Sequence, residues 1–254
     1  DALGRNFGAL ESVAQRMGAV LGAVAGTALT RGFIQLADSV TVLRNQLALS
    51  TGSIQQAEVA YGALFQIAQR SRTSFTELGA TFASISRATG ELGISQGRLL
   101  AVTEAIGNAI AISGGSAAGA QAALMQLSQG FASGTLRGEE LNSVMEQTPR
   151  LAKAIADGLG ITIGQLRQMG QDGKLTSQAV LGALESQARV LSGEVANSVT
   201  TVAQASQVAQ NALTALVGEI DRVTGSSSSM ASAITGAAES LGDISRALKG
   251  VEGA

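Results

Sequence analysis

The stretch that decides the fold is Leu127–Leu184, whose central residues 141–176 read LNSVMEQTPRLAKAIADGLGITIGQLRQMGQDGKLT. Thr148 stands directly before Pro149, the one proline of the chain. Proline suits the first position of a helix, because the N–H that it lacks would have no partner there. The pair therefore predicts a helix that Thr148 caps and that runs to about Asp157. Two glycines are expected to end this helix, Gly158 and Gly160.

The starts of the other helices carry similar signals. Thr162 is followed three residues later by Gln165, the spacing of a capping box, in which each side chain bonds the other residue's backbone. Further starts are expected at Ser53, Ser74, Ser95, Ser116 and Thr176. Apolar residues then recur at steps of three and four, and no stretch alternates in the way a half-buried strand would. The expected buried sides are Val59, Leu64, Ile67 and Ala68; Phe75, Leu78, Phe82 and Ile85; Leu99, Val102, Ile106 and Ile110; and Ala179, Val180, Ala183, Leu184 and Val190.

The composition also favours helices. Hydrophobic residues make up 45% of the 254 residues but aromatic residues only 3%, so the core must consist of Ala, Leu, Val and Ile. The 32 glycines indicate close helix contacts, since a glycine inside a helix costs about 0.5–1 kcal/mol relative to alanine. We expect an all-α fold: a bundle of short and medium helices, a long lead helix, and heptad-patterned C-terminal helices. The expected division is residues 1–52, 53–191 and 192–254.

The lead helix is expected over residues 10–49 and contains a glycine zipper, Gly18, Gly22 and Gly26. Small residues spaced by four let two helices approach closely, either inside a membrane or within a protein assembly. The uncharged run between Arg16 and Arg31 is fourteen residues long, whereas a straight membrane span needs about 20. We therefore favour packing in an assembly, with a membrane-inserting pore former as the alternative.

The C-terminal part carries a heptad pattern, which is typical of a coiled coil. Its first half is expected to be one unbroken helix, followed by a flexible joint at residues 225–229 and a second patterned segment. The first seam consists of Val195, Val199, Val202, Ser206, Ala209, Leu213, Leu216, Ile220 and Val223, and the second of Met230, Ile234, Ala237, Leu241, Ile244, Leu248 and Val251. The pattern predicts either a supercoil, in which copies of the chain associate along the first seam, or a long hairpin. Since the pattern reaches the last residues and the chain opens without Met, we expect a fragment of a longer protein.

The residues needed for common enzyme chemistry are missing. The sequence has no His and no Cys, which removes Ser/His and Cys/His nucleophiles and most zinc sites. Glu139 could form a glycosidase carboxylate pair with Glu140 or with Glu146, but adjacent glutamates at a helix start more often compensate the helix dipole. We expect neither an enzyme nor a bound cofactor or metal.

A helix-turn-helix spacing links Ala156, Gly160 and Leu166. The second helix of such a unit would present Thr162, Gln165 and Arg167 to DNA. The alternative is that the same crossing serves packing only. The net charge of −2 gives no sign of the basic surface that nucleic-acid binding uses, so we favour packing.

Four stretches of this sequence resemble the tape measure domain near the N-terminus of bacteriophage tail tape measure proteins. They are Phe131–Leu141 (FASGTLRGEEL), Glu146–Ala152 (EQTPRLA), Ile155–Ile161 (IADGLGI) and Gly173–Thr176 (GKLT). The resemblance covers roughly residues 74–191.

The resemblance implies a structural protein of the virion, held inside the tail tube, whose length sets the tail length during assembly. It implies tail tube, tail tip and tail assembly chaperone proteins as partners, and release ahead of the DNA, with transient contact at the host inner membrane. It also implies a short stay in the host cytoplasm during assembly. A helix rises about 1.5 Å per residue, so an extended helical chain is a natural ruler.

Overall fold

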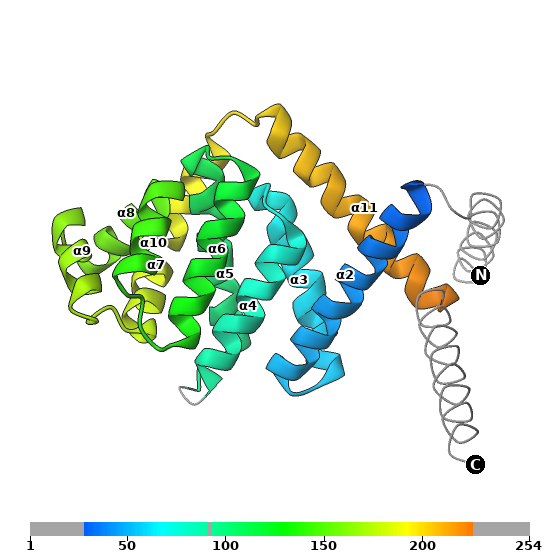
Figure 1. Cartoon of the computed structure of the whole chain (residues 1–254), viewed down its shortest axis with the longest axis horizontal. Helices are drawn as coiled ribbons and strands as arrows, with labels where there is room; N and C mark the ends of the chain where they lie inside the picture. The colour runs from blue at the N-terminus through cyan, green and yellow to red at the C-terminus, as the bar shows by residue number, and fades with distance from the viewer. Residues whose placement is uncertain (1–27, 91–92, 226–254) are drawn as a thin grey trace, which may run out of the picture. The chain divides into compact units, whose positions relative to one another are not determined.

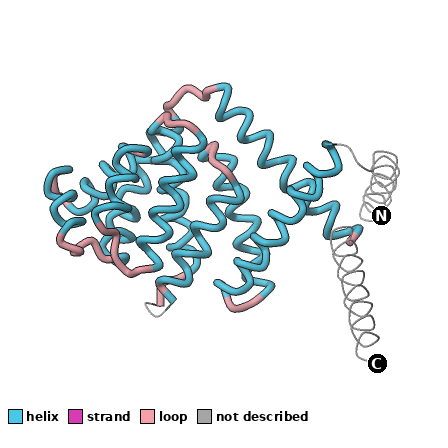
Figure 2. Tube along the Cα trace, in the orientation of Figure 1, coloured by secondary structure: helices cyan, strands magenta, loops and turns pink. Residues whose placement is uncertain are grey.

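The computed structural model describes residues 28–90 and 93–225. Within these ranges the chain forms ten α-helices and no strand, which confirms the all-α prediction (Figures 1 and 2). The helices are α2 (Ala28–Thr51), α3 (Ile54–Ser71), α4 (Phe75–Ala88), α5 (Gln96–Ser113), α6 (Ala117–Ala132), α7 (Gly138–Gln147), α8 (Pro149–Leu159), α9 (Ile163–Gln171), α10 (Ser177–Ala196) and α11 (Val202–Thr224).

The described residues fall into two compact units. The larger unit is residues 42–213, and the smaller one joins residues 28–41 to residues 214–225. Of the boundaries expected from the sequence, the one after residue 52 lies in the turn at Gly52, whereas the one after residue 191 lies inside α10. The three-part division stays a prediction.

The core of the larger unit is mainly aliphatic, with three phenylalanines and Tyr61. Helix α10 lies against α5 and α8, and α6 lies against α4 and α7. The largest fully buried side chains are Phe75, Phe82, Leu47, Leu64, Leu78, Ile85, Ile106, Leu127, Leu141, Leu151, Ile155 and Leu166. Burying each such side chain contributes about 1.5–3 kcal/mol to folding. The expected buried sides of α4 and α5 are confirmed, but Val59 and Val190 are exposed, because each lies on the outer side of its helix.

The predicted helix starts are confirmed at the serine caps. In each case the hydroxyl accepts a hydrogen bond from a backbone N–H one turn into the helix, at Ser53, Ser74, Ser95 and Ser116, and Thr176 does the same. Pro149 is the first residue of α8 as predicted. Thr148 is the N-cap residue of α8 as predicted, but its side chain makes no capping hydrogen bond, because its hydroxyl donates backwards to the Val144 carbonyl at 2.9 Å.

The two glycines expected to end α8 have different roles. Gly160 has φ 67° and ends the helix at Leu159. Gly158 does not end it: this residue is helical, and a side chain there would overlap the backbone of Ala183 in α10. The glycine is therefore needed for the close approach of α8 and α10.

The unbroken helix expected from Val195 onward is also wrong. Helix α10 ends at Ala196, and α11 begins only at Val202. Side chains satisfy both helix ends: Ser198 Oγ donates to the Val195 carbonyl at 2.8 Å, and Thr201 Oγ1 accepts from the N–H of Gln204 at 3.2 Å. These local bonds compete with helix continuation, although no glycine or proline stands in the break.

The smaller unit consists of the first part of α2 and the last part of α11. Its buried apolar residues are Ala37, Val40 and Val217. Thr214 and Asp221 are buried with them, on the same side of α11. This part of α11 therefore turns a partly polar face inward.

Candidate functional site

Helix α11 exposes its apolar seam and buries much of its polar side. The seam residues have the following exposed fractions: Val202 89%, Leu213 50%, Leu216 53% and Val223 59%. The buried side of the same helix holds Asn211, Thr214, Val217 and Asp221. A surface helix normally buries its apolar side, so the burial pattern of α11 is reversed.

The predicted seam needs one correction at its start. Val195 lies in the core of the larger unit at the end of α10, and Val199 lies in the break between the helices. The exposed helical seam therefore begins at Val202. Ile220 completes it and is half-buried.

Asn211 holds α11 to the turn between α3 and α4. Its side-chain oxygen accepts from the N–H of Phe75 at 3.0 Å, and its side-chain nitrogen donates to the Thr73 carbonyl at 2.7 Å. Gln207 donates to the same oxygen at 3.1 Å. Since Asn211 is buried, it supplies partners to two backbone groups that water cannot reach. We call the Asn211 side chain with Thr73 and Phe75 the asparagine clamp.

Arg72 ties the same turn to the break between α10 and α11. It has φ 55°, the one positive φ at a non-glycine residue in the described ranges, so its backbone is strained. The guanidinium Nη1 donates to Ser198 Oγ at 3.1 Å and to Gln204 Oε1 at 3.4 Å. Gln204 in turn donates to the Ala111 carbonyl at 2.9 Å. These contacts hold the start of α11 at a fixed place on the larger unit.

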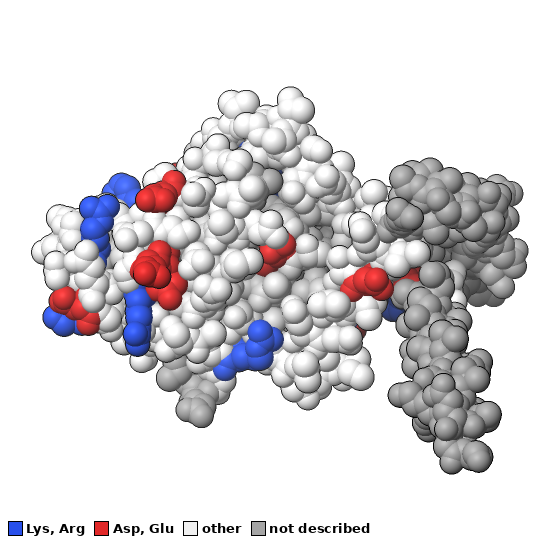
Figure 3. Space-filling view, in the orientation of Figure 1, with Lys and Arg blue, Asp and Glu red and all other residues white. Residues whose placement is uncertain are grey.

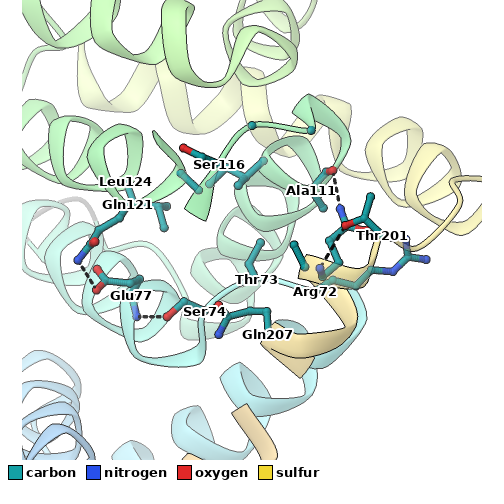
Figure 4. Close-up of a pocket in the computed structure, with 16 residues that line it drawn as sticks. Arg72, Thr73, Ser74, Glu77, Ala111, Ser116, Gln121, Leu124, Thr201 and Gln207 are labelled. Carbon is teal, nitrogen blue, oxygen red and sulfur yellow. Dashed lines mark hydrogen bonds between the residues drawn. The ribbon is translucent and has the colours of Figure 1, made fainter. Parts of the chain in front are cut away.

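A cavity of about 130 Å³ lies beside Arg72, lined by residues of α4, α5, α6 and the start of α11 (Figure 4). Its polar groups are paired with one another. Gln121 Nε2 donates to Glu77 Oε1 at 2.9 Å, and Ser74 Oγ accepts from the N–H of Glu77 at 3.4 Å. A water molecule occupies about 30 Å³ of liquid, so the cavity has room for a few waters. Its one carboxylate, that of Glu77, accepts the hydrogen bond from Gln121.

Arginine–glutamate pairs connect the helices of the larger unit. Arg150 on α8 meets Glu194 on α10 at 2.7 Å, and Arg98 on α5 meets Glu185 on α10 at 2.6 Å. The hydrogen bonds from Arg150 lower the pKa of the Glu194 carboxyl, and those from Arg98 lower the pKa of Glu185. Both acids therefore stay ionised and act as structural anions.

The residues predicted to face DNA lie at the α8–α9 corner. Thr162 and Gln165 form the complete capping box that the sequence predicted, so both side chains are occupied with the start of α9. Arg167 is exposed. The nearby lysines are neutralised, because Lys153 pairs with Asp157 at 2.8 Å and Lys174 with Asp172 at 3.0 Å. Figure 3 shows both signs of charge close together at this end. DNA contact stays a prediction, and this corner offers it no basic surface.

The described ranges, residues 28–90 and 93–225, contain no candidate metal site and no candidate membrane span. No group of three His, Cys, Asp or Glu side chains in these ranges could hold a metal ion, and none of the helices there is long and apolar enough to cross a membrane. Glu139 and Glu140 lie in the first turn of α7, where they compensate the helix dipole. Gly18, Gly22 and Gly26 lie outside the described residues, so their contact with a membrane stays a prediction.

Sequence reasoning missed Arg72 and Asn211. An arginine at a position that favours glycine gives no signal in a single sequence. Asn211 does give a sequence signal, because it is a polar residue that lies on the side of α11 opposite the predicted apolar seam and is buried there. That signal becomes visible only once the opposite side is known to be exposed.

One protein family matches most of the chain. The family described as "Tape measure protein" matches residues 31–222, which is more than half of the chain. No curated protein and no solved structure matches the chain. The family is one of structural proteins of bacteriophage tails. The chain therefore belongs to the tape measure protein family.

Proposed function

We propose that this chain is the assembly module of a tape measure protein, which sets tail length while the tail tube is built and assists ejection of the genome. In this role, copies of the chain associate along the exposed seam of α11. The larger unit is a folded domain of a protein whose extended helical part measures the tail length. Tail tube, tail tip and assembly chaperone proteins are the proposed partners. The proposed locations are the lumen of the tail tube, the host cytoplasm during assembly and the host envelope at ejection.

The observation that carries the proposal is the reversed burial of α11. Leucines at heptad spacing on its outer side form a row of exposed apolar residues, as is typical of an interaction surface. A seam of this kind is what a parallel bundle of identical helices needs, because each copy then covers the apolar side of the next. The asparagine clamp and the contacts of Arg72 hold residues 202–211 of α11 on the larger unit.

The test is the double substitution Leu213→Asp with Leu216→Asp. The mass of the chain is measured by light scattering over rising protein concentrations. We expect association of the unaltered chain to weaken by roughly 100-fold or more in the variant, since each buried leucine contributes about 1.5–3 kcal/mol. The control, Ala205→Asp with Ala212→Asp, places the same charge on exposed positions of α11 outside the seam. Equal association of the unaltered chain and the leucine variant would contradict the proposal.

A further inference from the structure

The sequence of the break between α10 and α11 is compatible with a helix. Residues 197–201 include no glycine and no proline, the two residues that helix interiors tolerate least. The apolar seam also continues across the break, from Val195 to Val199 and on to Val202. A helix already exists on either side, so joining the two would need no new nucleation. The break therefore depends on side-chain contacts rather than on a residue that forbids a helix.

The start of α11 is a capping box made by Thr201 and Gln204. Thr201 Oγ1 accepts from the N–H of Gln204 at 3.2 Å, and Gln204 Oε1 accepts from the N–H of Thr201 at 3.2 Å. In a continuous helix these two N–H groups would instead bond to the carbonyls four residues earlier, those of Asn197 and Thr200. The capping box is therefore made only in the broken form.

Gln204 connects this capping box to distant parts of the larger unit. The oxygen that accepts from Thr201 also accepts from Arg72 Nη1, which lies 132 residues away in the chain. Its Nε2 donates to the Ala111 carbonyl, 93 residues away. The same Arg72 Nη1 donates to Ser198 Oγ in the break, and Figure 4 shows the Arg72 side chain beside Thr201. Arg72 therefore stabilises the broken form relative to a continuous helix.

The backbone of Arg72 has a conformation that suits glycine. Its φ of 55° ends α3, and its N–H donates to the Ala68 carbonyl. Gly114 and Gly160 have the corresponding position at the ends of α5 and α8. Glycine adopts this conformation without strain. The substitution Arg72→Gly therefore removes the guanidinium while keeping the turn between α3 and α4.

We propose that the break is a hinge, and that α10 and α11 join into one continuous helix from Ser177 to Thr224 when the contacts of Arg72 are released. Association of copies along the seam drives this change, and this part of the inference rests on the proposed function. The seam would then begin at Val199, which is 90% exposed in the broken form. A partner shifts an equilibrium only as far as it binds one form better than the other, and the added turn of seam supplies that difference.

The asparagine clamp keeps the free chain in the broken form. Asn211 bonds to Thr73 and Phe75 only while residues 202–211 lie on the larger unit. A continuous helix would follow the direction of α10 instead, so these bonds would break together with those of Arg72. The helices therefore join only when association of copies offsets the loss of these contacts.

The distance between two spin labels tests the hinge in the full chain, which has no cysteine of its own. The labels are attached at Arg189→Cys on α10 and Ala212→Cys on α11, both at exposed positions. In a continuous helix these two positions lie about 35 Å apart. The broken form gives a shorter distance, because α11 does not follow the axis of α10. Double electron–electron resonance measures the distance, with excess unlabelled chain added so that only distances within one chain are recorded.

We expect the unaltered chain to show the shorter distance at low concentration and mainly the distance near 35 Å once copies associate. Arg72→Gly should show the long distance already at low concentration, with a ratio of long to short form at least about tenfold higher, because the broken form loses hydrogen bonds from a charged donor. The control Arg70→Ala removes a neighbouring guanidinium that bonds to Glu104 on α5, and it should leave the ratio unchanged. The absence of the long distance from Arg72→Gly or from associated copies would overturn the hinge.

The substitution Val202→Pro separates helix joining from mere detachment of α11. Proline suits the first position of a helix, which Val202 has in α11. Inside a continuous helix the same proline would remove a hydrogen bond and clash with the preceding turn. Added to Arg72→Gly, it should restore the shorter distance. A long distance that persists with the proline would overturn the joining of the two helices.

The two proposals fail separately. The mass of the chain decides association along the seam, and the distance between the labels decides the hinge. Associated copies that show only the shorter distance would remove the hinge and leave the assembly seam standing. A chain that stays monomeric at every concentration, but shows the long distance in Arg72→Gly, would remove the assembly seam and leave the hinge standing.

Discussion

Helices α4 and α11 have the same kind of apolar periodicity but use it in opposite ways. Helix α4 buries the apolar side that the sequence predicted, Phe75, Leu78, Phe82 and Ile85. Helix α11 exposes Leu213, Leu216 and Val223 and buries Asn211 in their place. A periodic pattern thus identifies an amphipathic helix without saying what its apolar side will meet. The apolar side of α4 is covered by other helices of the larger unit, whereas the apolar side of α11 is exposed.

The comparison predicts a large difference between two apolar truncations. Phe82→Ala should lower the free energy of unfolding of the larger unit by about 3–5 kcal/mol, because a fully buried ring leaves a cavity. Val202→Ala, at an exposed seam position, should change it by no more than about 0.5 kcal/mol. Urea denaturation followed by circular dichroism at low protein concentration measures both. Similar losses would mean that α11 is part of the core.

The asparagine clamp gives the next largest effect. Asn211→Ala removes the partners of the Phe75 N–H and the Thr73 carbonyl, and leaving such buried groups unpaired costs about 1–3 kcal/mol. We expect the loss to appear first as faster amide hydrogen exchange at the start of α4. Ser206→Ala, an exposed change on the same helix, is the control and should leave that exchange unchanged. Unchanged exchange in Asn211→Ala would show that apolar packing alone holds α11 in place.

Much of the larger unit could be predicted because its signals are local. The serine caps, Pro149 and the buried sides of α4 and α5 each depend on residues within one or two turns of chain. The break after Ala196 could not be predicted in this way, because heptad spacing continues across it. Part of what fixes the break is Arg72, which bonds Ser198 from 126 residues away. Single-sequence reasoning has no access to a contact of that range.

The smallest expected effect concerns the ion pair between Arg150 and Glu194, which joins α8 to the end of α10, next to the break. The pKa of Glu194 is lowered in the folded chain, first by the hydrogen bonds from Arg150. Its contribution to stability is therefore present above the ordinary glutamate pKa of about 4.3 and is lost as the pH falls through the lower folded value. Glu194 is more than one third exposed, so solvent screening holds the contribution to at most about 1 kcal/mol. We expect Glu194→Gln to be slightly less stable than the unaltered chain at pH 7, and the difference to be smaller near pH 3, by urea denaturation at both pH values. An equal loss of stability at the two pH values would show that the Glu194 side chain stabilises the end of α10 by packing rather than by its charge. This end of α10 would then depend on packed side chains, as α4 does.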